Sequence, residues 1–584
     1  MARKPEFYFT SLLSALACIV LLLNNVFCVL ADNGSKTPNV LFIMSDDQDS
    51  HMKSMDYMPH VKNLLAANGT TFQKHYCTTA LCCPSRISLF TGKCVHNTNV
   101  TDVRLPFGAY PKFVSEGLND DYLPLWLQDG GINTYYVGKF SNGHSIHNYR
   151  DPEVNGWTDS NFLLEPGMYD YENTTWARKG QQWKSFPNQN AVTITGQYAL
   201  EMLSQAANSG KPFFLTVAPT APHVGLNASG KGSFFPIPQK KWENAFGDET
   251  VPRAPNFNPQ KPSGVSWLQN LPYQNETLIE RLDQLYRARL RVIAGLDDMV
   301  ADLVSALEKH GILNNTHIIY TTDNGYHIGQ HRMGPGKRTG YETDINIPMV
   351  WRGPGVPVNK ITNTVSTHTD LAPTFLDLFG LPRRTQLDGS IMPLTESAMD
   401  ASVGSRVEHV NVEHWGAAHT YEVVAPHKNF NVAGEHNNTY KSVRIMGDGY
   451  NIYYSVWCTN EHELYDMTTD GYQMDNLLPK VRDIAQVPDR QLLGRPLSNV
   501  VARLDTLLLV LKSCRGSECT DPWRQLHPQG NVGSLREALN QQYDDFYASQ
   551  PKVMFSACQE GYLIEFEGPQ TAMQYNGGDS GLTR

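Results

Sequence analysis

Several features are scarce or absent in this chain of 584 residues, and each absence excludes a class of protein. Basic residues do not predominate, since the chain has 48 Lys and Arg and 58 Asp and Glu. The net charge of -10 lacks the basic excess that is typical of proteins that bind nucleic acid. After the N-terminus no run is long and apolar enough to span a bilayer. Internal repeats and low-complexity tracts are also missing. What remains is a globular protein with 41% apolar residues, too long for one simple core, so we expect two domains.

The N-terminal residues have the pattern of a secretory signal. Arg3 and Lys4 supply positive charge, Leu12–Leu23 supplies the apolar stretch, and Val29-Leu30-Ala31 offers a small-residue cleavage site. A signal anchor is the alternative, but Asn24-Asn25 ends the apolar run short of the roughly 20 residues of a membrane span. The sequence therefore predicts a signal peptide at 1–31 and a mature protein that is secreted or held in the cell wall, or else delivered to a vacuole- or lysosome-like compartment.

Cysteines and sequons agree with passage through an oxidising compartment. Eight of the ten cysteines remain after signal cleavage. Cys514 and Cys519 are close enough to close a small loop, and Cys458 and Cys558 could pair across the C-terminal region, although sequence alone does not set the connectivity. Eight Asn-X-Ser/Thr sequons, each weak evidence alone, start at Asn33, Asn68, Asn99, Asn173, Asn227, Asn275, Asn314 and Asn437.

Short apolar runs alternate with helical stretches from residue 39 to about 380, which predicts an α/β domain around a mainly parallel sheet. The expected strands are Val40–Met44, Thr134–Val137, Phe213–Val217, His317–Thr321 and Ile347–Trp351, and the expected helices are Leu278–His310 and Asp370–Phe379. Residues 151–185 and 235–273 have the pattern of long insertions, and the second should be irregular but stiff because it is rich in proline. Insertions of this length are usually lids or binding loops, and a flexible, glycosylated surface loop is the alternative.

The predicted secondary-structure pattern changes after about residue 400. Lys441–Met446, Tyr450–Trp457 and His462–Tyr465 predict an antiparallel meander, and Asn499–Lys512 predicts a helix that closes the unit. We therefore expect a catalytic domain at 32–400 and a smaller C-terminal α+β subdomain at 401–584, built on an antiparallel sheet. The segment Glu413-His414-Trp415 could border a pocket, although ordinary hydrogen bonding between domains is the more common role for such histidines.

Charged or coordinating residues follow four of the predicted strands. Asp46-Asp47 follow the first strand, Lys139 the second, His223 the third and Asp323-Asn324 the fourth. Ligands in open α/β sheets bind beyond the carboxyl ends of the strands, so these residues indicate one shared crevice. The carboxylates and the amide offer only oxygen, which suits calcium or magnesium, and no His/Cys cluster has zinc-like spacing.

The stretch Cys82-Cys83-Pro84-Ser85-Arg86, with Thr91-Gly92-Lys93 beyond it, carries the most information. Pro84 suits the first position of a helix, which would place Cys82 just before a helix N-terminus that favours an anion. Arg86 offers a planar donor fork that suits a tetrahedral oxyanion. The simpler alternative is a half-buried structural cysteine at an ordinary helix start.

This stretch resembles the signature of the type I sulfatases, which belong to the alkaline-phosphatase-like superfamily. Asp46 to Asp49, the lead-in Ala80-Leu81 and Asp323-Asn324-Gly325-Tyr326-His327 extend the resemblance, which is closest to fungal arylsulfatases and includes N-acetylglucosamine-6-sulfatases. The resemblance implies that a formylglycine-generating enzyme oxidises Cys82 to formylglycine (3-oxoalanine), and that one calcium ion is held by Asp46, Asp47, Asp323, Asn324 and the modified Cys82.

The resemblance also implies a covalent mechanism. The hydrated aldehyde of residue 82, assisted by the metal and Arg86, attacks the sulfur of a small-molecule sulfate ester, the alcohol or phenol leaves, and sulfate is expelled as the aldehyde reforms. Lys139, His223 and Lys337 match the positions that bind sulfate and protonate the leaving group. One departure stands out: the chain has Gly138-Lys139-Phe140-Ser141-Asn142 where many relatives have a histidine two residues after the lysine, and Asn142 or His144 could fill that space.

Three other functions compete with aryl sulfate hydrolysis. A glycan sulfatase of the N-acetylglucosamine-6-sulfatase kind needs the same core residues and differs only in its pocket walls. A phosphodiesterase or phosphatase of the superfamily would usually show a Ser or Thr nucleophile and a two-zinc histidine site, and neither pattern is present. A catalytically inactive sulfatase-fold binding protein would follow if Cys82 escaped oxidation. No nucleic acid partner is expected, and no membrane association after signal cleavage.

Overall fold

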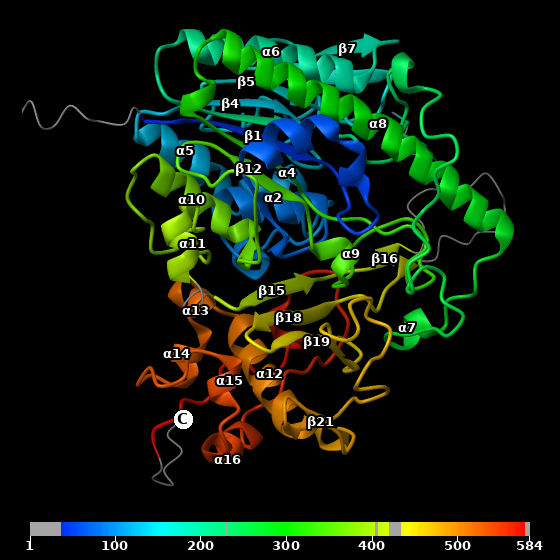
Figure 1. Cartoon of the computed structure of the whole chain (residues 1–584), viewed down its shortest axis with the longest axis vertical. Helices are drawn as coiled ribbons and strands as arrows, with labels where there is room; N and C mark the ends of the chain where they lie inside the picture. The colour runs from blue at the N-terminus through cyan, green and yellow to red at the C-terminus, as the bar shows by residue number, and fades with distance from the viewer. Residues whose placement is uncertain (1–36, 228–231, 403–406, 420–433, 578–584) are drawn as a thin grey trace, which may run out of the picture.

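The computed structural model describes residues 37–227, 232–402, 407–419 and 434–577, and the predicted signal peptide lies outside this range. Within the described residues, no helix is both long enough and apolar enough to cross a membrane. Figure 1 shows a larger unit of helices layered on a sheet, with a smaller unit of strands and helices packed below it.

A ten-stranded sheet forms the centre of the larger unit, with the order β13-β2-β12-β11-β1-β8-β4-β5-β6-β7. The five strands from β11 to β5 run parallel, whereas β12, β6 and β7 pair antiparallel with their neighbours. The bounds are β1 Asn39–Ser45, β2 Thr70–Phe72, β4 Asn133–Gly138, β5 Asp159–Leu163, β6 Asn173–Arg178, β7 Lys184–Pro187, β8 Phe213–Ala218, β11 Thr316–Thr322, β12 Met349–Arg352 and β13 Lys360–Thr362. The predicted mainly parallel sheet is confirmed.

Both faces of this sheet are covered by helices, as the unbroken apolar run of β1 requires. Val40, Phe42 and Met44 point into one core, and Leu41 and Ile43 point into the other. Figure 1 shows α6 and α8 on one side of the sheet and α2, α4, α5 and α10 on the other. Their bounds are α2 Cys82–Thr91, α3 Val95–Thr98, α4 Ala109–Ser115, α5 Leu123–Asp129, α6 Ala191–Asn208, α8 Glu276–Lys309 and α10 Leu371–Leu378.

The first predicted insertion is not a lid. Residues 151–185 supply β5 and β6 and lead into β7, which together extend the sheet at one edge. Buried Phe162 and Trp176 anchor these strands, but their polar neighbours hide the strand pattern in the sequence. The second insertion, 235–273, is irregular as predicted and carries only a 3-10 turn at Lys240–Trp242 and the short helix α7 Ser266–Gln269.

The smaller unit is a four-stranded antiparallel sheet in the order β15-β18-β19-β20. One face packs against α12 Leu497–Leu511, and the opposite face packs against the larger unit. A tight turn joins β18 to β19, whose register pairs Gly447 with Tyr450. The bounds are β15 His409–His414, β18 Tyr440–Gly447, β19 Tyr450–Trp457 and β20 His462–Asp466.

Short elements complete the described chain. Two disulfides join Cys458 to Cys558 and Cys514 to Cys519, the two pairs that the sequence suggested. The short elements are α9 Glu342–Ile345, α11 Glu396–Ser402, α13 Ser517–Thr520, α14 Pro522–Leu526, α15 Leu535–Ala538, α16 Asp544–Ala548, β3 His75–Tyr76 with β14 Ser366–Thr367, β9 Gly225–Leu226 with β10 Ser233–Phe234, β16 Ala418–His419 with β17 Gly434–Glu435, and β21 Gln491–Leu492 with β22 Arg495–Pro496.

Candidate active site

Nine side chains that the sequence singled out meet at the carboxyl ends of the parallel strands. Four strand ends supply most of them, the first helix turns of α2 supply two, and the loop after β11 supplies the last. All nine are buried, and they form one connected set of contacts. They are Asp46 and Asp47 after β1, Lys139 after β4, His223 after β8, Asp323 and Asn324 after β11, Cys82 and Arg86 of α2, and Lys337.

Asp46 lies between two cations at one side of the site. Lys139 Nζ is 2.5 Å from Asp46 Oδ2, and Arg86 Nη2 is 3.4 Å from the same oxygen. Arg86 also donates from Nε to Asp323 Oδ2 at 2.8 Å. Burial alone would raise the pKa of Asp46, but the charges of Lys139 and Arg86 outweigh it and hold that pKa below its usual value. Asp46 is therefore ionised at neutral pH.

Asp47 organises the opposite side. Lys337 Nζ contacts both of its carboxylate oxygens, at 2.5 and 2.6 Å, and Asn324 Nδ2 donates to Oδ1 at 2.8 Å. His223 Nε2 is 3.5 Å from Asp47 Oδ2. His223 Nδ1 donates to the carbonyl of Val224 at 2.7 Å, so this bond fixes the ring with Nε2 toward the site.

Cys82 lies between these two sides. Its Sγ is 3.2 Å from Lys337 Nζ and 3.5 Å from Asp46 Oδ1. Burial raises the pKa of the Cys82 thiol well above its ordinary value despite the two nearby lysines. The unmodified side chain is therefore a neutral thiol and a poor nucleophile.

The start of α2 differs from the sequence-based prediction. The helix begins at Cys82 itself, not at Pro84, because Leu81 is extended and its carbonyl accepts the first helical hydrogen bond from Ser85 N at 2.9 Å. Pro84 is tolerated as the third residue, where a helix has no internal partner for the N–H. Ser85 Oγ donates to the carbonyl of Asp323 at 2.5 Å, which ties α2 to the end of β11.

The donor set fits a hard divalent cation. Ligand atoms of Asp46, Asp47, Cys82 and His223 all lie within 4.8 Å of one another, and Asn324 Oδ1 is buried without a hydrogen-bond partner. The carboxylates of Asp46, Asp47 and Asp323 formally balance the cations Arg86, Lys139 and Lys337. A divalent ion would therefore leave the site positive and attractive to an anion.

Tyr169 is a site residue that the sequence analysis missed. Its ring lies 4.4 Å from the His223 ring, and Lys139 Nζ lies 4.8 Å from its centroid. Asn142 Nδ2 donates to Tyr169 Oη at 2.7 Å. Tyr169 stands in the segment expected to be an insertion, and no sequence signal distinguishes it from core tyrosines.

Of the two candidates for the missing histidine, Asn142 adjoins the site and His144 does not. His144 packs among aromatic rings, 4.6 Å from Tyr110 and 5.2 Å from Phe162 between ring centroids. Burial lowers the pKa of His144 to about 3, so its ring is neutral at physiological pH. His144 is therefore a core residue.

Two residues of the segment Glu413-His414-Trp415, namely Glu413 and Trp415, make structural contacts. Glu413 pairs with His96 and Lys441, and Trp415 Nε1 donates to Glu567 at 2.6 Å. These buried bonds join β15 to the rest of the C-terminal unit and to α3, which is the ordinary structural role.

Comparison with known proteins places these residues in a family. The family described as "Sulfatase" matches residues 38–381. An arylsulfatase from Volvox carteri is 34% identical over 550 residues, covering 89% of this chain and 81% of the relative. Human N-acetylglucosamine-6-sulfatase is 32% identical over 539 residues, covering 86% of this chain and 91% of the relative.

A solved structure agrees with the fold. BT4656, in complex with its substrate D-glucosamine-2-N,6-O-disulfate, superposes with a TM-score of 0.60 at 20% identity, covering 76% of this chain and 94% of the other. At this identity the likeness concerns architecture alone.

Proposed function

The chain belongs to the sulfatase family, whose members hydrolyse sulfate esters, and on that premise we propose that it is an arylsulfatase whose nucleophile is formylglycine at position 82. One observation carries the proposal: Cys82 Sγ lies between Lys337 Nζ and Asp46 Oδ1, inside a buried ring of three carboxylates and three cations. A neutral thiol there is a weak nucleophile, whereas an oxygen at the same place suits a hard cation and the attack on sulfur.

We propose that calcium occupies this ring. Asp46, Asp47, Asp323 and Asn324 would hold the ion, with an oxygen of the matured residue 82. When bound, the ion supplies Lewis-acid chemistry and positive charge for the attack on sulfur. The partnerless Oδ1 of Asn324 supports this assignment, because a buried amide oxygen without a partner costs free energy unless a ligand satisfies it.

The chain's own cations bind the sulfate group in this proposal. Arg86 and Lys139 share Asp46 and approach from one side, and Lys337 approaches from the side of Asp47. Their positions are fixed by buried hydrogen bonds, including Arg86 Nη1 to the carbonyl of Lys139 at 2.6 Å. Fixed charges around the sulfate oxygens stabilise the transition state without reorganisation.

Proton transfer falls to His223 and Lys337. His223 Nε2 is oriented into the site by the bond from Nδ1 to Val224, so a protonated ring can donate to the leaving oxygen. Once it has given up that proton, the same Nε2 is a neutral base. Many relatives have a histidine two residues after the position of Lys139, which this chain lacks. We assign the later proton transfer, in the step that expels sulfate, to His223, since Asn142 cannot act as a base.

If Lys337 or His223 protonates the leaving oxygen, its replacement by Ala is expected to lower kcat/KM more for esters with basic leaving groups than for activated aryl sulfates. Protonation matters most when the departing oxygen is most basic. The measurement is kcat/KM for each variant across phenyl sulfates of graded leaving-group pKa. An unchanged slope in both variants would show that the two residues only hold sulfate.

Tyr169→Leu is expected to lower kcat/KM between about 2- and 30-fold, because it removes a cation–π contact to Lys139 worth roughly 0.5–2 kcal/mol. The substitution also removes the aromatic ring that packs against the ring of His223. Tyr169→Phe keeps the ring and loses only the bond from Asn142, so its activity should stay close to that of the wild type. Equal losses in both variants would assign the effect to the hydroxyl group rather than to the ring.

The aryl preference rests on the Volvox relative, and an N-acetylglucosamine-6-sulfatase-like activity is the second candidate because the human relative is almost as similar. Steady-state kinetics on p-nitrophenyl sulfate and on 6-sulfated N-acetylglucosamine distinguish them. An aryl preference predicts the higher kcat/KM for the first substrate, and the reverse order would support the glycan alternative.

Maturation in the secretory pathway is part of the same proposal, because the formylglycine-generating enzyme acts there. Each of the seven sequon asparagines within the described residues is exposed or half-buried, so each is accessible to glycosylation. The two disulfides also agree with an oxidising compartment. We propose that the mature protein is secreted or held in the cell wall, with a vacuole- or lysosome-like compartment as the alternative.

A further inference from the structure

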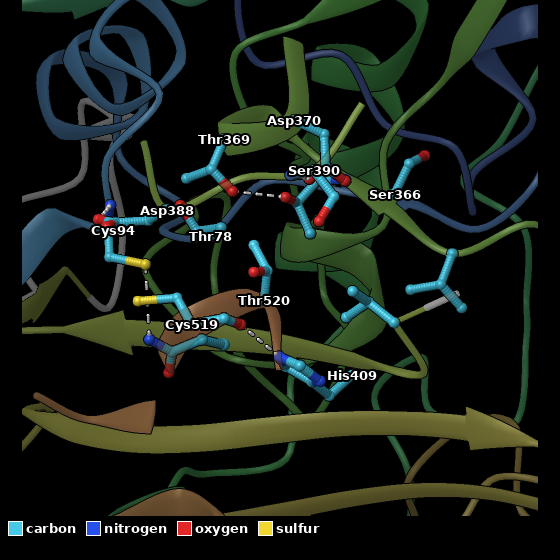
Figure 2. Close-up of a pocket in the computed structure, with 14 residues that line it drawn as sticks. Thr78, Cys94, Ser366, Thr369, Asp370, Asp388, Ser390, His409, Cys519 and Thr520 are labelled. Carbon is cyan, nitrogen blue, oxygen red and sulfur yellow. Dashed lines mark hydrogen bonds between the residues drawn. The ribbon is translucent and has the colours of Figure 1, made fainter. Parts of the chain in front are cut away.

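Cys94 is a buried thiol beside the Cys514–Cys519 disulfide, on the side of the molecule where the two units meet. The chain leaves α2 at Gly92, so Cys94 stands at the opposite end of that helix from Cys82. Its Sγ lies within 4.8 Å of Cys514 Sγ and a ring nitrogen of His96, and within 4.8 Å of Cys519 Sγ and a carboxylate oxygen of Asp388. In Figure 2 the sulfur atoms of Cys94 and Cys519 point toward one another.

The two cysteine-bearing segments are held in register by one carboxylate. Asp388 accepts hydrogen bonds from Cys94 N and from Gly516 N, each at 2.7 Å. Asn97, of the adjoining α3, donates to the carbonyl of Cys514 at 2.8 Å. The approach of the thiol to the disulfide is therefore fixed by buried backbone contacts, and is not a chance proximity of mobile side chains.

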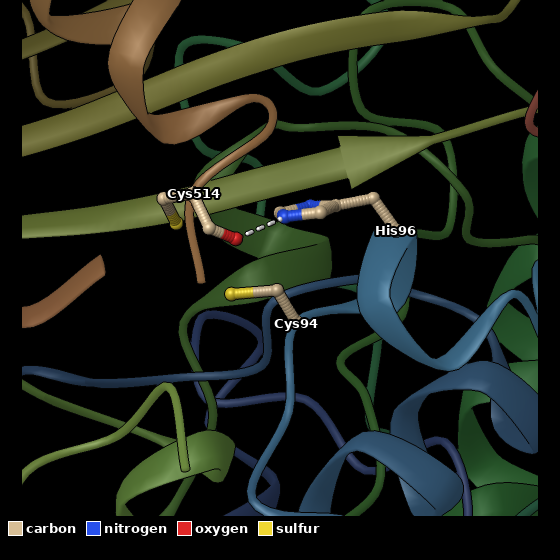
Figure 3. A group of neighbouring side chains, drawn as sticks. All are labelled: Cys94, His96 and Cys514. Carbon is tan, nitrogen blue, oxygen red and sulfur yellow. Dashed lines mark hydrogen bonds between the residues drawn. The ribbon is translucent and has the colours of Figure 1, made fainter. Parts of the chain in front are cut away.

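His96 links Glu413 to the backbone of Cys514 through its two ring nitrogens. Its Nδ1 is 2.9 Å from Glu413 Oε1 and its Nε2 is 2.9 Å from the carbonyl of Cys514, a contact that Figure 3 shows. The Glu413 carboxylate and the Cys514 carbonyl can each accept a hydrogen bond from the ring. Burial alone would raise the pKa of Glu413, but His96 and Lys441 outweigh it and lower that pKa to about 2, so the carboxylate is charged.

We propose that Cys94, Cys514 and Cys519 form a thiol–disulfide exchange site. The Cys94 sulfur attacks Cys519 Sγ, the Cys514–Cys519 bond breaks, and a Cys94–Cys519 bond forms. The electron pair of the broken bond stays on Cys514, whose Sγ lies within 4.8 Å of a ring nitrogen of His96. The proton of Cys94 passes to water and returns to Cys514, so no oxidant or reductant is consumed. A cavity of about 30 Å³, lined by Cys94, Cys519 and Asp388, has room for that water.

The exchange changes what the disulfide connects. The present bond closes a ring between residues five positions apart, whereas the product joins Cys94, which directly precedes α3, to Cys519 of the C-terminal unit. Burial, Asp388 and Glu413 raise the pKa of the Cys94 thiol well above its ordinary value, so exchange should be slow at neutral pH and faster as the pH rises. The titratable and charged groups around Cys94 and its cavity are His96 of α3, Asp370, Asp388, His409 and Glu413 of β15, and Lys441 of β18.

Disulfide mapping of the full-length protein tests this proposal. The protein is incubated at pH 6 and pH 9, quenched in acid, alkylated after unfolding, digested and analysed by mass spectrometry. We expect a Cys94–Cys519 peptide pair that increases at pH 9, together with an alkylated Cys514, while Cys458–Cys558 stays unchanged. Cys94→Ser should abolish the new pair, and Cys77→Ser, which removes another buried thiol, should not.

A second variant tests the geometry without relying on exchange. In Cys514→Ser, the oxidation that normally forms the Cys514–Cys519 bond should instead join Cys94 to Cys519 in most of the protein. The proposal is overturned if the wild type shows only Cys514–Cys519 with free Cys94 at both pH values, if a Cys94–Cys514 pair forms instead, or if Cys94 and Cys519 both remain alkylatable in Cys514→Ser. None of these outcomes depends on sulfatase activity.

Discussion

Cys82→Ala is expected to abolish hydrolysis of p-nitrophenyl sulfate, with a loss of about a million-fold, the size seen when an enzyme loses its nucleophile. The physical reason is that residue 82 alone lies between Lys337 Nζ and Asp46 Oδ1 at the centre of the ring. The fold should survive, because the substitution removes one buried sulfur, makes only a small cavity and leaves no charge unpaired. Steady-state kinetics, with circular dichroism as the test of folding, measure both effects.

Cys83→Ala is the matched control, because this neighbouring cysteine is equally buried and precedes the same proline. Its Sγ faces Ser141 Oγ at 3.0 Å, away from the carboxylates, so substantial activity should remain. Equal loss in the two variants would mean that the nucleophile is wrongly assigned.

Asp323→Asn is expected to lose the bound divalent ion and to lower activity about 100- to 1,000-fold, a loss as large as that from removing one oxyanion-hole donor, because the ion and the fixed position of Arg86 both depend on this carboxylate. Asp323 supplies negative charge to the proposed metal site and also accepts from Arg86 Nε at 2.8 Å. The amide keeps the volume of the side chain and loses the charge. Elemental analysis of the purified variant should show less than stoichiometric calcium.

Asp49→Asn provides the control for this change. Asp49 is also a buried carboxylate close to β1, but it accepts from Met52 N at 2.9 Å and Ser54 N at 3.4 Å and takes no part in the ring. Its variant should keep the ion and most of the activity. Stoichiometric zinc in the wild type, with no calcium or magnesium, would contradict the assignment of a hard cation.

The gathering of the polar site residues could be predicted from the sequence, because the ends of buried strands can be recognised there. Apolar runs such as Val40–Met44 indicate buried parallel strands. Polar residues directly after such strands lie at the same edge of the sheet, where the carboxyl ends of the strands meet. The structure brings together Asp46, Lys139, His223 and Asp323 in that way.

Other features could not be read from the sequence because they depend on tertiary contacts. Tyr169 is one of 27 tyrosines, and only the fold places its ring against His223. His144 looked like a candidate from its spacing, but aromatic packing draws it into the core. The segment 151–185 seemed to be an insertion because its strands lie at a sheet edge, where polar residues are tolerated and weaken the alternating pattern.

The state of residue 82 tests the central claim most directly. Trypsin should release residues 75–86 as one peptide, which contains Cys77, Cys82 and Cys83, all free of disulfides. After alkylation of the unfolded protein, mass spectrometry should show two labelled cysteines and an aldehyde, or its hydrate, at position 82. Three labelled cysteines in active protein would contradict the formylglycine account.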